Sequence, residues 1–374
     1  KDMISTHFPM EENRKIKVGI THGDINGIGY EVIIKALDDP RMVELCTPVI
    51  YGSAKVASYY RKALELPGSQ YHQIANATDA KDGECNIINV IPEDTRPEPG
   101  QSTTAAGEAA LAALERAVAD LRQGAIDVLV TAPINKHNIQ NDKFTFPGHT
   151  EYLEASLGDG NSEALMILCD DTLRVALVTT HMPLASISEA ITKDNVLAKI
   201  RALDNSLRYD FGIPHPRIAV LSLNPHAGES GLLGSEEQET IIPAITEAQT
   251  AGIEAYGPYA ADGLFGSGNY RSFDGILAMS HDQGLAPFKT VAMEQGINFT
   301  AGLNRVRTSP DHGTGYDIAG QGIADETSMR HAIYHAIDIW RNRRRYREIH
   351  RNPLRKQYFE KGKDNVVLDL TKED

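Results

Sequence analysis

Short apolar runs alternate along this chain with segments in which apolar residues recur every three or four positions. The short runs are typical of buried strands, and the longer periodic segments are typical of amphipathic helices. Their alternation predicts parallel strands joined by helical crossovers, and therefore an α/β fold. The predicted strands are Lys17–Thr21, Pro48–Gly52, Cys85–Val90, Asp127–Thr131, Glu163–Cys169, Leu173–Thr180, Arg217–Pro225, Asp274–Met279 and Gly296–Gly302.

Helices and loops fill the intervals between these strands. Side chains that accept backbone hydrogen bonds mark helix starts, and we expect Asp194 to be an N-cap and Ser235–Gln238 to form a capping box. Stretches rich in Gly and Pro predict loops, here Tyr256–Asp262, the surface loop Gly263–Gly268 and a tight turn at Gly284. The other predicted helices are Tyr30–Leu37, Thr103–Arg122 and Glu326–Arg345, with a further helix after Glu151.

Three of the predicted strands are closely followed by a histidine, namely His181, His226 and His281. In open α/β sheets, ligands bind beyond the carboxyl ends of the strands. Three imidazoles placed there are candidate ligands for one metal ion. Each histidine could instead be a hydrogen-bonded structural residue or a single catalytic base, and no fixed-distance motif decides between these alternatives.

Positively charged side chains also follow the predicted strands. Lys289 and Arg307 are expected in loops after strands, with Asn298 on a strand beside them. Cations at the mouth of a cleft suit an anionic substrate, because guanidinium and ammonium groups bind phosphate and carboxylate. The alternative is that Lys289 and Arg307 pair with nearby aspartates such as Asp282 and Asp311.

Two further turns could contact a negatively charged ligand. Lys136 follows the strand that ends at Thr131, and His149 with Thr150 lies near a predicted helix N-terminus, where backbone N–H groups favour an anion. The first strand leads into a glycine-rich turn with Gly27 and Gly29. Its spacing is neither a dinucleotide fingerprint nor a P-loop, so close packing and ligand contact both remain open.

Composition narrows the class of protein. The chain has 374 residues, enough for two domains or one large one, and its net charge of −14 argues against nucleic-acid binding. Cys46, Cys85 and Cys169 are far apart, which favours a reduced compartment. No apolar run approaches the ~20 residues of a membrane span, and no signal-peptide pattern is present, so we expect a cytoplasmic protein that binds no membrane. The basic run Arg341–Lys356 is expected to be a solvated helix against acidic surface.

Together, the motifs THGDINGIG, TAPINK, FPGHTEY, TTHMPL, LNPHAGESGLLGSEE, MSHDQGLAPFK, GINFTAGL and VRTSPDHGTG resemble the 4-hydroxythreonine-4-phosphate dehydrogenase family. The resemblance runs from Lys17 to Ile339. It implies the isocitrate-dehydrogenase-like α/β/α architecture, a cleft between two domains and a homodimer. The expected domains are 1–145 with 305–374, and 146–304, the latter carrying the metal ligands and the dimer interface.

The resemblance also implies roles for individual residues. His181, His226 and His281 match a divalent-metal site shared between subunits, with Zn²⁺ favoured and Mg²⁺ or Co²⁺ possible. NAD or NADP is expected in the same cleft. The residues that match substrate contacts are His149, Thr150, Lys289, Asn298 and Arg307, and those proposed for the cofactor are Gly27, Gly29, Asn224 and Glu229.

The implied reaction is oxidation of 4-phosphohydroxy-L-threonine to a β-keto acid, which decarboxylates to 3-amino-2-oxopropyl phosphate in pyridoxal 5'-phosphate biosynthesis. Lys289 and Asp282 are the candidates for the general base. One alternative is a dehydrogenase of threonate or erythronate 4-phosphate. Others are a zinc-dependent hydrolase, because three histidines also suit water activation, and a non-catalytic protein that binds a partner through its basic tail.

Overall fold

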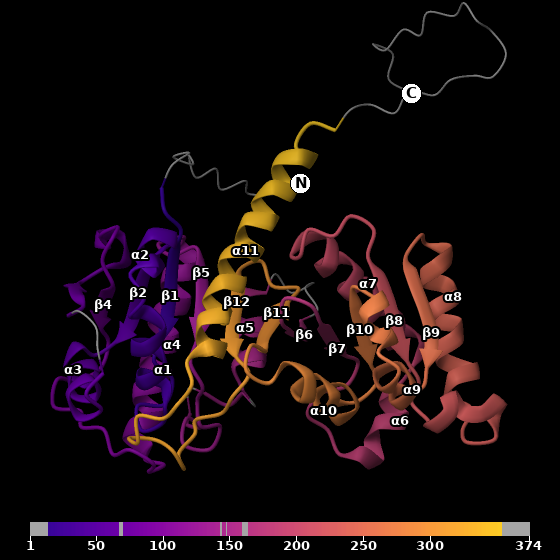
Figure 1. Cartoon of the computed structure of the whole chain (residues 1–374), viewed down its shortest axis with the longest axis horizontal. Helices are drawn as coiled ribbons and strands as arrows, with labels where there is room; N and C mark the ends of the chain where they lie inside the picture. The colour runs from indigo at the N-terminus through magenta and orange to yellow at the C-terminus, as the bar shows by residue number, and fades with distance from the viewer. Residues whose placement is uncertain (1–13, 67–69, 143, 147, 159–163, 354–374) are drawn as a thin grey trace, which may run out of the picture.

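A single sheet of 12 strands runs through the molecule in the order β3-β4-β2-β1-β5-β12-β11-β6-β7-β10-β8-β9 (Figure 1). This computed structural model describes residues 14–66, 70–142, 144–146, 148–158 and 164–353. The strands are β1 Lys17–Thr21, β2 Thr47–Gly52, β3 His72–Ile74, β4 Asn86–Asn89, β5 Val128–Thr131, β6 Leu165–Cys169, β7 Arg174–Leu177, β8 Arg217–Leu221, β9 Glu254–Tyr259, β10 Gly275–Ala278, β11 Ile297–Ala301 and β12 Val306–Pro310.

Helices cover the faces of this sheet, as the alternating pattern predicted, and the α/β class is confirmed. They are α1 Gly29–Leu37, α2 Arg41–Leu45, α3 Ala54–Ala63, α4 Thr104–Gln123, α5 His149–Leu157, α6 Ile187–Ala190, α7 Lys193–Tyr209, α8 Ile242–Thr250, α9 Ala261–Gly266, α10 His281–Ala292 and α11 Thr327–His350. No helix in these described ranges combines the length and the apolar character that crossing a membrane requires.

The two halves of the sheet run in opposite directions. β1, β2, β5 and β12 pair in parallel in one half, and β7, β10, β8 and β9 pair in parallel in the other. Between them, β11 is antiparallel to both β12 and β6, and β6 is antiparallel to β7. The carboxyl ends of the two halves therefore lie at opposite edges, so a site that uses both must cross the face of the central strands.

The alternation of side chains fixes what lies on each face of these central strands. The Thr308 hydroxyl donates to the Ala332 carbonyl of α11 at 2.7 Å, so Thr308 faces that helix. Its neighbour Arg307 points to the opposite face, because successive residues of a strand alternate. Pairing places Arg307 beside Thr300 and Ser309 beside Asn298 on this second face. The central strands thus separate α11, seen crossing them in Figure 1, from a polar face.

Several local predictions were wrong. Tyr256–Asp262 and Gly263–Gly268 are not loops, because β9 and α9 occupy most of them. The N-cap of α7 is Thr192, whose hydroxyl accepts the Asn195 N–H at 3.2 Å, and not Asp194. Gly284 lies inside α10 and makes no turn; a Cβ there would approach the Leu177 side chain at 2.8 Å.

Two cations also lie in elements other than the predicted loops. Arg307 is on β12 and Lys289 is on α10. The long C-terminal helix was predicted correctly, but it is not wholly solvated. Arg343 is 4% exposed and its Nε donates to Asp210 at 2.6 Å.

The proposed division into two domains remains a prediction. The sheet is continuous across both predicted boundaries, since β12 pairs with both β5 and β11. Residues 354–374 of the basic tail lie outside the described part of the chain.

Candidate functional site

A cleft of about 310 Å³ opens on the polar face of the central strands. Side chains from β5, β6, β11 and β12 form its floor, and the loop after β5, the start of α5 and the helix α10 form its walls. It brings together seven of the residues singled out from the sequence, namely His149, Thr150, His181, His281, Lys289, Asn298 and Arg307, together with Lys136. Segments far apart in the sequence thus meet here.

Arg307 gives the cleft a buried positive charge. It is only 2% exposed. Its Nε and Nη2 donate to the Thr131 hydroxyl at 3.0 and 2.7 Å, and its Nη1 donates to the Thr300 hydroxyl at 3.1 Å. Within the described residues it makes no ion pair with a carboxylate, so the alternative of a local aspartate partner does not hold for Arg307. Burial lowers its pKa to about 10, which still leaves it charged at neutral pH.

Three other polar groups in the cleft are buried without a hydrogen-bond partner among the described residues. They are His149 Nε2, at the start of α5, Asn298 Oδ1, on β11, and His312 Nε2, just after β12. Burial, and then the charges of Arg307 and Lys136, hold the pKa of His149 well below its ordinary value. Because buried polar atoms in proteins are normally satisfied, this set of unused atoms beside a cation indicates the binding site of a polar, negatively charged molecule.

Two of the three predicted metal ligands lie together at one end of the cleft. The ring centroids of His181 and His281 are 5.7 Å apart. Asp282 Oδ1 lies 2.7 Å from His281 Nδ1, an arrangement that orients an imidazole and leaves its Nε2 available. Burial, more than the charge of Lys136, lowers the pKa of His181, so this imidazole is neutral at neutral pH. Neutral imidazoles are the form that binds a divalent cation.

His226 does not line this cleft within one chain. It lies in the segment Pro225–Gly231, where His226, Ala227, Glu229 and Ser230 all have positive φ. Such a backbone persists only when its surroundings hold it.

The buried Glu237 holds the base of this segment. Its Oε1 accepts the N–H groups of Leu223 and Asn224 at 2.8 and 2.7 Å. The Asn224 amide in turn donates to Glu236 and Glu237. The role of Glu237 was missed from the sequence, although the predicted capping box contains it.

The two candidates for a general base have different surroundings. Lys289 Nζ lies 3.2 Å from Asp311 Oδ1, so the local ion pair considered as an alternative is present for this residue. The Asp282 side chain is 91% exposed and contacts His281.

A residue missed from the sequence, His312, also lines the cleft, and its buried Nε2 has no partner among the described residues. No signal for it was available, because His312 follows β12, a strand that the sequence pattern did not predict.

The glycine-rich turn after β1 is closely packed. A Cβ on Gly27 would lie 2.5 Å from the Thr314 carbonyl, and one on Gly29 would lie 2.2 Å from the His22 carbonyl. Close backbone approach therefore explains both glycines. The buried Asp24 of the same turn accepts the Tyr316 hydroxyl at 2.6 Å and the Asn138 amide at 2.8 Å, and so ties the turn to two loops beside the cleft.

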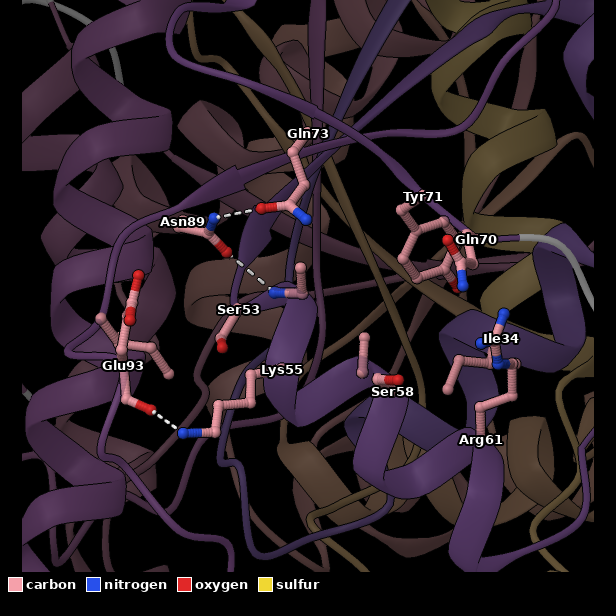
Figure 2. A pocket seen from close by; sticks show the side chains of 13 residues that line it. Ile34, Ser53, Lys55, Ser58, Arg61, Gln70, Tyr71, Gln73, Asn89 and Glu93 are labelled. Atoms are coloured by element: carbon pink, nitrogen blue, oxygen red, sulfur yellow. Dashed lines mark hydrogen bonds between the residues drawn. The ribbon is translucent and has the colours of Figure 1, made fainter.

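A second hollow, of about 430 Å³, lies far from these residues around the start of α3 (Figure 2). Three hydrogen bonds join residues that line it. Gln73 accepts from Asn89 at 3.0 Å, and Lys55 Nζ donates to the Glu93 carbonyl at 2.8 Å. None of the described residues that line this hollow has the buried, unpartnered side-chain atoms that distinguish the cleft.

The chain is an α/β protein whose cleft combines a buried cation, unpartnered polar atoms and two neighbouring imidazoles. The family model described as pyridoxal phosphate biosynthetic protein PdxA matches residues 44–336, and the chain belongs to this family. The resemblance inferred from the motifs is thereby confirmed.

Individual relatives agree with this assignment. The chain is 58% identical to 4-hydroxythreonine-4-phosphate dehydrogenase from Bacteroides thetaiotaomicron, over 98% of this chain and 100% of that protein. It is 39% identical, over 87% of this chain and 98% of the relative, to a protein from Oceanobacillus iheyensis with the provisional name D-threonate 4-phosphate dehydrogenase. A crystal structure of 4-hydroxythreonine-4-phosphate dehydrogenase from Klebsiella pneumoniae matches with a TM-score of 0.75 and 33% identity, covering 88% of this chain and 99% of that one.

Proposed function

We propose that this protein oxidises 4-phosphohydroxy-L-threonine with NAD and a divalent metal, giving a β-keto acid that loses CO₂ to form 3-amino-2-oxopropyl phosphate in pyridoxal 5'-phosphate biosynthesis. The observation that carries the proposal is the buried Arg307, which has no carboxylate partner among the described residues and faces a cleft beside two neighbouring imidazoles. The names of the most similar relatives support the same substrate.

The chain's own cations would bind the phosphate and carboxylate ends of the substrate. Hydrogen bonds to Thr131 and Thr300 fix the guanidinium of Arg307, so it needs little reorganisation to bind an anion. Lys136 and the first N–H groups of α5 lie on the same cleft, where the helix dipole favours negative charge. His149 and Asn298 would use their unpartnered buried atoms to orient polar groups of the substrate.

The donor set fits a divalent metal. His181 is neutral, His281 is oriented by Asp282, and we propose that His226 of the partner subunit completes the site. Zn²⁺ is the favoured ion, and Mg²⁺ or Co²⁺ is less favoured. When bound, the ion would supply Lewis acidity that lowers the pKa of the substrate hydroxyl. Lys289 is the better candidate for the general base, because it lines the cleft, whereas Asp282 is exposed and engaged with His281.

We place NAD, or NADP, in the same cleft, next to the glycine-rich turn. Not all of the four residues proposed from the sequence have side-chain or backbone groups that are free to contact the dinucleotide. The space above Gly27 and Gly29 is filled by neighbouring backbone, and the Asn224 amide is bonded to glutamates. Contacts from backbone atoms near Gly27 and from Glu229 remain the proposal.

A homodimer in the cytoplasm is part of the proposal. Its support is a group of exposed apolar side chains in the segments that follow His181 and His226. Leu184 is 82% exposed and Leu232 is 77% exposed, with Met182 and Leu233 beside them in sequence. Large exposed apolar side chains next to two candidate metal ligands suit an interface that completes the site.

The relative named for D-threonate 4-phosphate supports a second candidate, the same chemistry on a phosphorylated sugar acid. NADH formation should be measured with 4-phosphohydroxy-L-threonine and with D-threonate 4-phosphate, each with and without a chelator. The first candidate requires turnover of the amino acid to exceed that of the sugar acid and to depend on metal. Preference for the sugar acid would transfer the assignment to the second candidate. Phosphate release without NADH would indicate a hydrolase instead.

A further inference from the structure

A second cluster of metal-ligating side chains lies outside the cleft. It consists of Asp171, in the turn between β6 and β7, and of His331 and His335 on α11. Their ligand atoms all lie within 4.8 Å of one another, which among the described residues holds for this group and not for His181, His226 and His281 of one chain. We propose that Asp171, His331 and His335 form a second divalent-metal site, selective for Zn²⁺ or a similar transition-metal ion.

This cluster and the cleft lie on opposite faces of the central strands. Thr308 bonds the Ala332 carbonyl of α11, next to His331, whereas Arg307 faces the cleft. Asp171 also precedes β7, while His181 follows the other end of that strand. The cluster therefore has no part in the proposed catalytic site.

The helix presents both imidazoles in the same direction. His331 and His335 are one turn apart, at positions i and i+4, which share one side of an α-helix. Their ring centroids are 6.4 Å apart with an angle of 39° between the rings. Two histidines four residues apart on a helix are the spacing used by helical zinc ligands.

The β6–β7 turn presents the carboxylate. Asp170 Oδ1 accepts the N–H groups of Thr172 and Leu173 at 2.7 and 2.6 Å and so fixes the turn. Its neighbour Asp171 is left with a side chain that is 70% exposed. This side chain can rotate toward an ion without disturbing the packing.

The strongest sign of a missing ligand is His335. This residue is 9% exposed, yet its Nε2 has no hydrogen-bond partner among the described residues. The nearest carboxylate oxygen, Asp171 Oδ1, lies 3.5 Å away. Burial lowers the pKa of His335 more than Asp171 raises it, so the imidazole is neutral near pH 7. A buried neutral imidazole with an unused nitrogen next to a carboxylate and a second imidazole suits a metal ion.

The donor set selects the class of ion. Two imidazole nitrogens and one carboxylate oxygen suit Zn²⁺ and its neighbours better than Ca²⁺ or Mg²⁺, which prefer oxygen ligands. In a tetrahedral zinc site, metal–ligand bonds of about 2.0–2.1 Å place the ligand atoms about 3.3 Å apart. Small side-chain rotations would bring the three ligand atoms to this separation. A hollow of about 280 Å³ lined by Leu45 and Tyr334 adjoins the group and leaves room for water as a fourth ligand. A bound ion would tie the β6–β7 turn to α11.

The experiment is a Zn²⁺ titration of the metal-stripped full-length protein by calorimetry at pH 7.5. All variants carry His281→Ala, which removes a cleft ligand. We expect this background to bind one Zn²⁺ per chain, the His331→Gln/His335→Gln variant to lose that binding, and Asp171→Asn to weaken it by tenfold or more. The control is His350→Gln, at the far end of the same helix, which should bind as the background does.

Equal binding by the background and the His331→Gln/His335→Gln variant would refute the site. Asp171→Asn separates the loss of a metal ligand from misfolding, because this exposed side chain can be changed without loss of the fold. In addition, Zn²⁺ should raise the melting temperature of the background but not that of the double variant. A metal-induced rise that is equal in both would also refute the proposal. NADH formation without the His281 change should be the same in the double variant as in the parent.

Discussion

At the residue scale, Arg307 determines what the cleft can bind. Burying a guanidinium without a carboxylate partner is unfavourable, and in the described part of the chain its acceptors are two threonine hydroxyls. An anionic ligand would offset this desolvation. The two threonine hydroxyls also fix the plane of the guanidinium, so this position requires arginine and not merely a positive charge.

Arg307→Lys therefore tests the geometry of the site. The lysine keeps the charge but cannot bond Thr131 and Thr300 while also binding an anion through a planar fork. We expect KM for the phosphorylated substrate to rise about 10- to 100-fold, the equivalent of roughly 1.5–3 kcal/mol for a hydrogen bond to a charged group. The matched control is Arg305→Lys, because Arg305 Nη2 donates to the Arg122 carbonyl on the surface. An unchanged KM in Arg307→Lys would remove Arg307 from substrate binding.

His22 predicts how stability depends on pH. It is fully buried and stacks on Tyr30, and burial lowers its pKa from 6.5 to about 4. The unfolded chain therefore binds more protons between pH 6.5 and pH 4, and stability falls as the pH falls through this window. Between pH 7 and pH 5 this residue should account for a loss of about 2 kcal/mol in the free energy of unfolding.

His22→Phe should remove that part of the pH dependence while keeping the stack on Tyr30. Urea unfolding at pH 7 and pH 5 measures it, with His215→Phe, in an exposed loop, as the control. A pH dependence in His22→Phe as steep as that of the parent would show that other groups are responsible.

At the element scale, the buried Glu237 fixes the entrance to the segment Pro225–Gly231, in which His226, Ala227, Glu229 and Ser230 have positive φ. The Glu237 carboxylate accepts hydrogen bonds from two backbone N–H groups at the entrance to the segment. It therefore takes the place of the backbone acceptors that a neighbouring strand would supply. Glu237→Ala leaves both partly buried donors without this acceptor. We expect a loss of about 2–4 kcal/mol in stability and weaker binding of metal at the proposed site, because His226 is no longer held in place.

Glu239→Ala is the matched control for that prediction, since Glu239 is in the same short helical segment and is exposed. Urea unfolding and Zn²⁺ affinity should both be measured. If Glu237→Ala and Glu239→Ala behaved alike in the two measurements, Glu237 would have no role in positioning His226.

The elements that could be predicted from the sequence are those with a continuous apolar run or a helical period, such as β1, β10 and α11. β9 and β12 were missed for physical reasons. β9 is the last strand of the sheet, where an edge tolerates Gly257 and Pro258. β12 alternates between Arg307, which faces the cleft, and Thr308, whose hydroxyl is bonded to α11, so it has no apolar run.

The candidate site could be predicted as a set of residues but not as an arrangement. His181, His226 and His281 stand out because each follows a predicted strand, yet the two halves of the sheet run in opposite directions, which no local pattern shows. The bond from Asp282 to His281 and the role of Glu237 depend on contacts between side chains that only the folded chain brings together.

At the scale of the whole molecule, the proposed metal site is incomplete within one chain. His181 and His281 approach each other, whereas His226 lies outside the cleft of its own chain. The exposed Leu184 and Leu232 lie close in sequence to His181 and His226. Both observations suit a C2 dimer in which each subunit lends His226 to its partner, because such an interface repeats the same exchange at two sites.

Mixing two inactive variants tests this exchange. His226→Ala and His281→Ala should each be inactive with a native fold, as circular dichroism would show. When the two are unfolded together and refolded, about half of the dimers are mixed. Each mixed dimer then has one site with both histidines intact and one site with neither, so about a quarter of the parent activity should return. If His226 instead served its own subunit, every site in the mixture would lack one ligand and no activity would return.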